Sequence, residues 1–393
     1  MVAFKNFAGL RNDVSAERFG PADLALATNV DLDNTGKLLS RGGYLNKISA
    51  AIHSLWAAED ICLFVTGTNL KRLGTDLTSS TVIRSDLTAG LRMSYFLLNG
   101  QVYYSNGEQT GIYGPSGNRT WGIVPPVFQP LAEAAYGDMT DGIYQFALTY
   151  VRRDGQESGT GIADSINLTT GAINFTDIPV SDDPDVTHKI LYLTPPDGDV
   201  LYRALILDNA TTSASYNGGQ LLTPLQTQFL QQAPAGQLVG YAFGHAWVAN
   251  GLFLHYSDPH GLELFDLRKY FGFEGNITMF APVQDGIWIG TDRYTYFLSG
   301  RDPESMTLYR KANDGVLPGT LQYAPASQVK GANQGPDESV PLWTSHSGIC
   351  TGLSGGTLLN LTQARYAISA ASEGAALYHT QNGIDQYLTV LRS

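Results

Sequence analysis

Few residues in this chain have types and spacings that are used in catalysis. The segment from Gly352 to Gly356 reads G-x-S-x-G, the turn that presents the serine nucleophile of many hydrolases. That turn needs a strand before the serine and a helix after it, whereas the following run, Thr357 to Leu361, is strand-like. We therefore expect a hairpin turn at Ser354 and no catalytic nucleophile.

Metal and cofactor motifs are weak as well. His245, His255 and His260 lie close in sequence, but strand alternation places the first two on different strands and no acid or cysteine recurs at ligand spacing. The segment from Asp31 to Gly36 begins like a calcium loop, yet Gly42 stands where a bidentate glutamate belongs. No glycine-rich phosphate loop ends in Lys-Ser or Lys-Thr. The sequence predicts neither a metal nor a cofactor.

A set of acidic residues could supply the carboxylate pair of a polysaccharide-cleaving enzyme. Its members are Asp258, Glu263, Asp266, Asp285 and Asp292. They lie near expected turns, where aspartate is common for conformational reasons. We predict that the protein is not an enzyme and assign no catalytic residue, although this alternative stays open.

The strongest pattern is a repeated cassette, made of an apolar strand, a glycine turn and a second apolar strand. Its six copies begin at Glu59, Asn99, Gly244, Asp285, Ser347 and Asn382. Several spacings lie near about 40 residues, the size of a four-stranded propeller blade. A lone hairpin cannot bury its apolar face, but small sheets packed around an axis can. The sequence predicts an all-β protein, a β-propeller of about six blades.

The long interval between the second and third cassettes predicts an insertion. Short strands bounded by turns follow the extended linker Pro125–Pro130, which is typical of a β-sandwich of the immunoglobulin or fibronectin-III kind. We expect propeller in residues 1–137, an inserted sandwich in 138–218, and propeller again in 219–393, closing with the N-terminal segment. The apolar spacing over Leu221–Gln232 indicates a helix.

Two tryptophans and two cysteines occupy cassette positions. Trp247 and Trp288 are equivalent in their cassettes, so we expect them to fill the wedge between blades and not to bind a ligand. Cys62 and Cys350 fall in cassettes that would not be neighbours, so we expect buried free thiols and no disulfide.

The charge and the hydropathy of the chain argue against tight nucleic-acid binding and against a membrane span. The formal net charge is −12 over 393 residues and there is no basic run, so tight binding to nucleic acid is not expected. Residues Met1–Phe7 do not read as a signal peptide, and no apolar run approaches the roughly 20 residues of a membrane span. We expect no membrane-spanning segment and a protein made and kept in the cytoplasm.

Three stretches resemble one family when taken in order. They are Leu10 to Tyr44, which ends in Arg-Gly-Gly-Tyr, Pro234 to Pro259, which ends in Tyr-Ser-Asp-Pro, and Ile277 to Gly300, which contains Asp-Gly-Ile-Trp-Ile-Gly-Thr-Asp. In combination they resemble the tail nozzle, or packaged-DNA stabilisation, proteins of short-tailed bacteriophages. The resemblance reaches both ends of the chain and skips mainly the expected sandwich.

The resemblance implies a virion role. It implies a propeller subunit of a hexameric ring in the distal tail tube, below the portal and adaptor, with tail fibre or tailspike proteins as further partners. Double-stranded DNA would be held behind the ring and leave through it without tight binding, and assembly would take place in the host cytoplasm. Two other functions stay open: a receptor- or peptide-binding propeller adaptor, and a propeller glycosidase or lyase acting on host surface polysaccharide.

Overall fold

The computed structural model describes residues 7–33, 35–169, 171–332, 335, 338–362, 365–368, 371–381 and 384–393. In these ranges the chain is all-β, and its helical elements are the short 3-10 turns η1 (Ala16–Arg18), η2 (Ala326–Gln328) and η3 (Ser354–Gly356). No helix of this part of the chain is long and apolar enough to span a membrane. The segment read for a signal peptide lies outside the described residues, apart from Phe7.

Five four-stranded antiparallel sheets, here called blades one to five, lie on the two sides of the insertion in the sequence. Blade one contains β5 (His53–Ala58), β6 (Ile61–Thr66), β7 (Asn69–Leu73) and β8 (Ser80–Arg84), and blade two contains β9 (Ser94–Leu98), β10 (Gln101–Ser105), β11 (Thr110–Gly114) and β12 (Gly117–Arg119). Blade three contains β20 (Leu238–Ala242), β21 (His245–Asn250), β22 (Phe253–Asp258) and β23 (Gly261–Gly272), and blade four contains β24 (Ile277–Val283), β25 (Gly286–Thr291), β26 (Thr295–Ser299) and β27 (Thr307–Ala312). Blade five contains β28 (Gln322–Pro325), β29 (Ser339–Ser345), β30 (Gly348–Gly352) and β31 (Leu358–Asn360).

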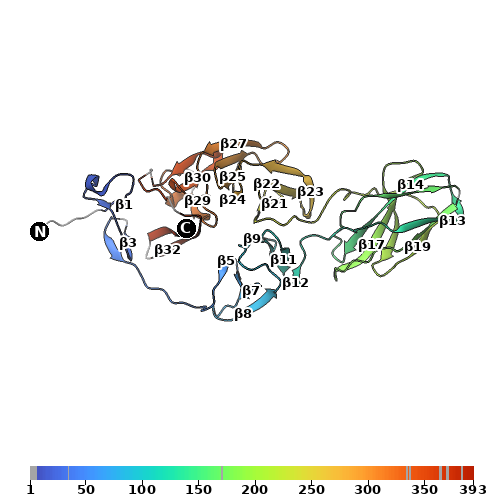
Figure 1. Ribbon diagram of the computed structural model, residues 1–393, viewed down its shortest axis with the longest axis horizontal. Helices are drawn as coiled ribbons and strands as arrows, with labels where there is room; N and C mark the ends of the chain where they lie inside the picture. The colour runs from blue at the N-terminus through green and yellow to red at the C-terminus, as the bar shows by residue number, and fades with distance from the viewer. Residues whose placement is uncertain are drawn as a thin grey trace.

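The blades stand side by side: the first strands of blades one to four lie next to one another, and β24 of blade four contacts the second strand of blade five, β29. β5 contacts β9, β9 contacts β20, and β20 contacts β24. The hairpin of β32 (Glu373–Gln381) and β33 (Ile384–Arg392) follows blade five, where β32 contacts β28. Arg92, in the segment before β9, reaches Glu373 and the Gly374 carbonyl at 3.0 Å, so the hairpin also touches the first blades. This is a β-propeller arrangement (Figure 1).

The cassettes correspond to strands of these blades. The first four provide the turn and second strand of a blade, namely β6, β10, β21 and β25. The fifth provides β30, which is the third strand of its blade, because the second strand is β29. That shift by one strand accounts for part of the long interval before Ser347, and the long connection between β28 and β29 contributes as well. The sixth falls at the β32–β33 hairpin, and its Asn382 and Gly383 lie outside the described residues.

The insertion between blades two and three consists of two facing sheets. One contains β13 (Leu131–Met139), β16 (Gly171–Thr176) and β19 (Ala214–Tyr216), and the other contains β15 (Asp164–Leu168), β14 (Gly142–Arg152), β17 (Val186–Leu193) and β18 (Tyr202–Asp208). Phe146 and Leu191 from the second sheet pack with Phe175 from the first in one buried core. The expected boundary at residue 138 falls inside β13, so this unit begins at Leu131.

The N-terminal strands pair with one another. β1 (Gly9–Leu10) pairs with β2 (Asp23–Leu24), and β3 (Val30–Leu32) pairs with β4 (Leu38–Ser40). Among the described strands none of them pairs with β32 or β33, contrary to the expected closure of the ring by strand pairing. The segment is attached instead through side chains: Asp23 pairs with Arg365, and the Asn12 amide donates to the Ala367 carbonyl.

The helix expected over Leu221–Gln232 is wrong. The Leu225 N–H donates to the Leu201 carbonyl, and Gln231 exchanges hydrogen bonds with Phe265 of β23. The apolar side chains therefore reach the insertion and blade three from an irregular segment. Tertiary contacts of the backbone outweigh a weak local preference for helix.

Candidate functional site

Four charged side chains meet where the insertion joins the propeller. The Arg119 guanidinium binds both carboxylate oxygens of Glu263 at 2.6 Å. Arg152 binds the same Glu263 at 3.0 Å and Asp183 at 2.6 Å. The Arg152 side chain is 1% exposed and that of Glu263 is 5% exposed. Two arginines and two carboxylates thus form a buried cluster, which we call the junction cluster.

The junction cluster connects elements far apart in the sequence. Arg119 ends β12, Glu263 lies in β23, and Arg152 ends β14, so two blades and the insertion each contribute. Arg152 also donates to the Thr120 hydroxyl at 2.6 Å. Buried charges are stable only when paired and hydrogen-bonded, which these are. The cluster therefore fixes the insertion to the propeller.

A groove of about 690 Å³ lies beside the junction cluster. Its wall on the propeller side is formed by the ends of β8 and β12, and its other walls are the linker Val124–Phe128 and the loop Pro179–Asp185. Val127 is 89% exposed and Phe128 is 57% exposed. A volume of this size is within the range of about 300–1,000 Å³ that is typical of binding sites.

The charge of the groove is acidic. Arg84 is held by Asp86, and Arg119 is held by Glu263, so both cations are already neutralised. Asp183 is paired with Arg152, whereas Asp182 and Asp185 form no salt bridge with any described residue. Burial, with the nearby Asp182 as a smaller cause, raises the pKa of Tyr150 in the wall to about 12. An occupant would therefore carry apolar groups and positive charge.

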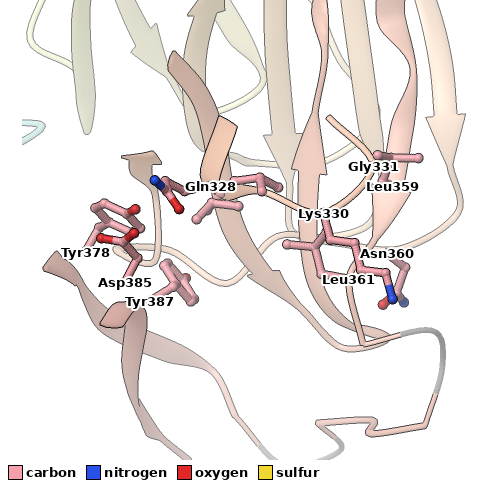
Figure 2. Close-up of a pocket in the computed structure, with 11 residues that line it drawn as sticks. Gln328, Lys330, Gly331, Leu359, Asn360, Leu361, Tyr378, Asp385 and Tyr387 are labelled. Atoms are coloured by element: carbon pink, nitrogen blue, oxygen red, sulfur yellow. The ribbon is translucent and has the colours of Figure 1, made fainter. Parts of the chain in front are cut away.

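A second, smaller cavity of about 390 Å³ separates blade five from the C-terminal hairpin. Figure 2 shows Tyr378 and Asp385 together on the hairpin side, with Leu359 and Leu361 on the side of β31. Burial, with Asp385 as a further cause, raises the pKa of Tyr378. The Tyr387 hydroxyl donates to the Thr320 carbonyl at 2.6 Å. These contacts attach the hairpin to blade five.

The serine turn and the histidines do not form a site. Ser354 lies in η3, between the antiparallel strands β30 and β31, which confirms the hairpin turn. His245 is on β21, where its Nδ1 is 2.7 Å from the Ser257 carbonyl, and His255 is on β22. Among the described residues no three His, Cys, Asp or Glu are grouped so that they could hold a metal ion.

The calcium-like segment is a tight turn. Asp33 Oδ1 accepts the N–H groups of Thr35 and Lys37 at 2.8 and 2.9 Å, between β3 and β4. The neighbouring Asn34 lies outside the described residues. The Asp33 carboxylate is therefore used to close a turn, as aspartate often is.

Four of the five candidate acids form ion pairs or hydrogen bonds within the fold. Glu263 belongs to the junction cluster, and Asp266 is paired with Arg268 at 2.8 Å. Asp285 accepts the Gly355 N–H at 2.8 Å, and Asp292 accepts the Asn276 N–H at 3.1 Å. Asp258 ends β22. The structure does not bring the five together into one site. Glu263 is explained by its arginine partners, Arg119 and Arg152, which no sequence motif singles out.

Tryptophans fill the spaces between blades, as expected. Trp247 and Trp288 are 0% exposed, and the core clusters place the first between blades three and four and the second between blades four and five. Trp121 and Trp343 are buried in the same way, although they lie outside the cassettes.

Cys62 and Cys350 are free thiols, and burial raises the pKa of Cys350 to about 11.

Comparison with known proteins gives distant structural similarity only. The chain matches no family model and no curated protein. Among solved structures it is similar to BBS1N in complex with ARL6DN (12% identity, TM-score 0.35, covering 88% of this chain and 91% of that chain). It is also similar to the Neurospora crassa Pan2 WD40 domain (10% identity, TM-score 0.33, 85% and 84% covered) and to the N-terminal domain of Nup159 (9% identity, TM-score 0.33, 86% and 73% covered). Similarity at this level places the chain in no family.

Replacing Gly352 by alanine is expected to destabilise the fold. A Cβ at this position would lie 2.4 Å from the Trp288 ring, between two blades. Because both groups are held by the packed core, we expect a loss of about 1–3 kcal/mol in the free energy of unfolding. Gly43→Ala is the control, since a Cβ there meets no atom within 4 Å. Equal denaturation midpoints for the two variants would contradict this account of the core.

Lys189 should make stability depend on pH. Its side chain is 0% exposed and donates to the Pro179 carbonyl at 2.7 Å, and burial lowers its pKa to about 8 from 10.5. Below pH 8 Lys189 is protonated in both the folded and the unfolded protein. Between about pH 8 and 10.5 the unfolded chain binds more protons than the folded chain, so the free energy of unfolding rises with pH. Relative to Lys189→Met, the unfolding midpoint of the natural protein should rise over that interval. A constant difference between the two proteins across the interval would show that Lys189 is not the cause.

Proposed function

We propose that this protein is a tail nozzle subunit of a short-tailed bacteriophage. The observation that carries the proposal is where the resembling stretches lie in the fold. Pro234 to Pro259 contains β20–β22, and Ile277 to Gly300 contains β24–β26, so each supplies most of one blade. Leu10 to Tyr44 contains β1–β4. The resembling stretches thus cover most of blades three and four and the N-terminal strands, and none of them lies in the two-sheet insertion.

The proposal includes a finer description of the fold. In it, the hairpin β32–β33 is the inner part of a sixth blade, and the N-terminal segment closes the ring beside that blade through the contacts of Asp23 and Asn12, without strand pairing. The two-sheet insertion is an immunoglobulin- or fibronectin-III-like sandwich.

The proposed role is structural. A hexameric ring of this chain would form the distal tail tube below the portal and adaptor, contact tail fibre or tailspike proteins, retain packaged DNA and conduct it during ejection. The net charge of −12 supports passage without tight binding, because DNA is held mainly by cations that contact phosphates. The protein would be assembled in the host cytoplasm and act in the virion tail.

One observation favours a second candidate, a peptide-binding propeller adaptor. The acidic and apolar groove beside the junction cluster is large enough for an extended peptide. The polysaccharide enzyme gains no comparable support, since Glu263 and Asp266 are both paired with arginine.

Electron microscopy of the purified protein and of virion tails tests the main proposal. We expect a sixfold ring from the purified chain and the same ring at the tip of the tail. A protein that stays monomeric and binds a host receptor would favour the adaptor, and hydrolysis of capsule or lipopolysaccharide would favour the enzyme. Basic side chains dominating the wall of a solved ring would contradict the proposed passage of DNA.

A further inference from the structure

The groove beside the junction cluster exposes apolar and acidic groups together. Val127 and Phe128 are 89% and 57% exposed on the linker wall. Asp182 and Asp185 on the opposite loop have no cation partner among the described residues. Burying the apolar side chains favours binding of an apolar segment, and the carboxylates favour a segment that carries positive charge. A segment with both properties would therefore bind this groove most favourably.

A segment of this same chain has that composition. Residues Arg41–Ile48, here called the arm, connect β4 to β5 and form no regular secondary structure. Tyr44 is 87% exposed and Leu45 is 82% exposed. From Asp33 to Glu59 the intervening sequence contains Lys37, Arg41 and Lys47 but no acidic residue. The arm is therefore cationic, apolar and extended.

The arm and the groove lie at different places on one chain. Figure 1 shows the arm on the side of the molecule that carries the N-terminal strands β1 and β3, whereas β12 and β17 mark the junction with the insertion toward the other side. A contact between two different patches of identical chains is heterologous, and such contacts generate rings when the rotation closes.

We infer that the arm of one copy binds in the groove of a neighbouring copy. Arg41 and Lys47 then face Asp182 and Asp185, while Tyr44 and Leu45 cover Val127 and Phe128. The inference rests on the homo-oligomer of the proposed function and identifies the surfaces that join its subunits. Because exposed charges contribute, the contact weakens as the salt concentration rises.

Charge reversal tests the contact in the full-length protein by light scattering coupled to size exclusion. The double variant Arg41→Glu, Lys47→Glu and the double variant Asp182→Lys, Asp185→Lys should each lose association, because like charges then meet. The chain carrying all four changes should regain it. The control Arg18→Glu, Arg293→Glu changes the net charge equally at two exposed cations elsewhere and should associate normally. If rings form and every variant retains them, the inference is wrong while the proposed function stands.

A labelled peptide tests the groove independently of assembly. The probe is a fluorescein-labelled peptide with the sequence Ser40 to Ala50, added to the variant Arg41→Glu, Lys47→Glu, whose own arm no longer fills the groove. We expect saturable binding by anisotropy, and about tenfold weaker binding, or ~1.4 kcal/mol, when Asp182→Asn and Asp185→Asn are added. No binding, or binding unaffected by the added changes, would overturn the inference in any oligomeric state. If the variant binds the peptide but the natural protein forms no ring, the proposed nozzle is contradicted and the groove assignment is supported.

Discussion

Replacing Glu263 by glutamine is expected to lower the free energy of unfolding by about 3–5 kcal/mol. Glu263 pairs with both Arg119 and Arg152, and the Arg152 side chain is 1% exposed. The amide has nearly the same shape but no charge, so Arg119 loses its carboxylate partner and Arg152 keeps only Asp183, at a junction that water hardly reaches. Chemical denaturation monitored by tryptophan fluorescence measures the loss, since Trp121 donates to the Leu262 carbonyl beside the cluster at 2.8 Å.

Glu304→Gln is the matched control for this prediction. Glu304 also pairs with a cation, Lys269, at 3.0 Å, but its side chain is 63% exposed. Exposed pairs contribute about 0–1 kcal/mol, so the same chemical change should have little effect there. Similar denaturation midpoints for the two variants would mean that the junction cluster does not hold the insertion to the propeller.

Replacing Trp288 by alanine is expected to cost about 3–5 kcal/mol as well, for a different reason. The indole is 0% exposed, lies 5.0 Å from the Phe297 ring and 5.8 Å from the Trp343 ring, and donates to the Leu353 carbonyl at 3.1 Å. Removing it leaves a cavity between blades four and five and an unmade hydrogen bond. The midpoint temperature of thermal unfolding and the midpoint denaturant concentration should both be lower than in the natural protein.

Tyr136→Ala is the control for the aromatic deletion. Tyr136 is 102% exposed on β13, so its removal creates no cavity and should change stability by less than about 0.5 kcal/mol. If Trp288→Ala were as stable as Tyr136→Ala, the wedge of aromatic side chains between blades would not stabilise the ring.

The strand–turn–strand units of the blades can be predicted from the sequence, because each unit is formed by residues that lie close together in the chain. The turn at Asn99 and Gly100 and the apolar strand after it became β9–β10, and the equivalent turn at Asp285 and Gly286 became β24–β25. Asn99 and Gly100 adopt the backbone geometry that favours such a turn, with φ of 50° and 71°. The burial of Trp247 and Trp288 followed from their place in the repeat.

Longer-range features were harder to predict from the same patterns. The apolar spacing over Leu221–Gln232 indicated a helix, but the partners of this segment, Leu201 and Phe265, lie in other elements. The fifth cassette corresponds to the third strand of its blade and the first four to the second, and the cassette pattern misses β29, an apolar strand with a tryptophan at Trp343. In both cases contacts with distant residues decided between local alternatives of similar energy.

The sequence by itself determined the repeated strand–turn–strand units, the all-β class, the presence of an insertion and the acidic charge, because each depends on composition or on residues close together in the chain. Only the tertiary structure decided the junction cluster and the groove. Arg119, Arg152 and Glu263 are separated by long stretches of sequence, and a buried charge is stable only where folding brings its counter-charge within hydrogen-bond distance. That encounter depends on how the blades and the insertion pack, which no local pattern specifies.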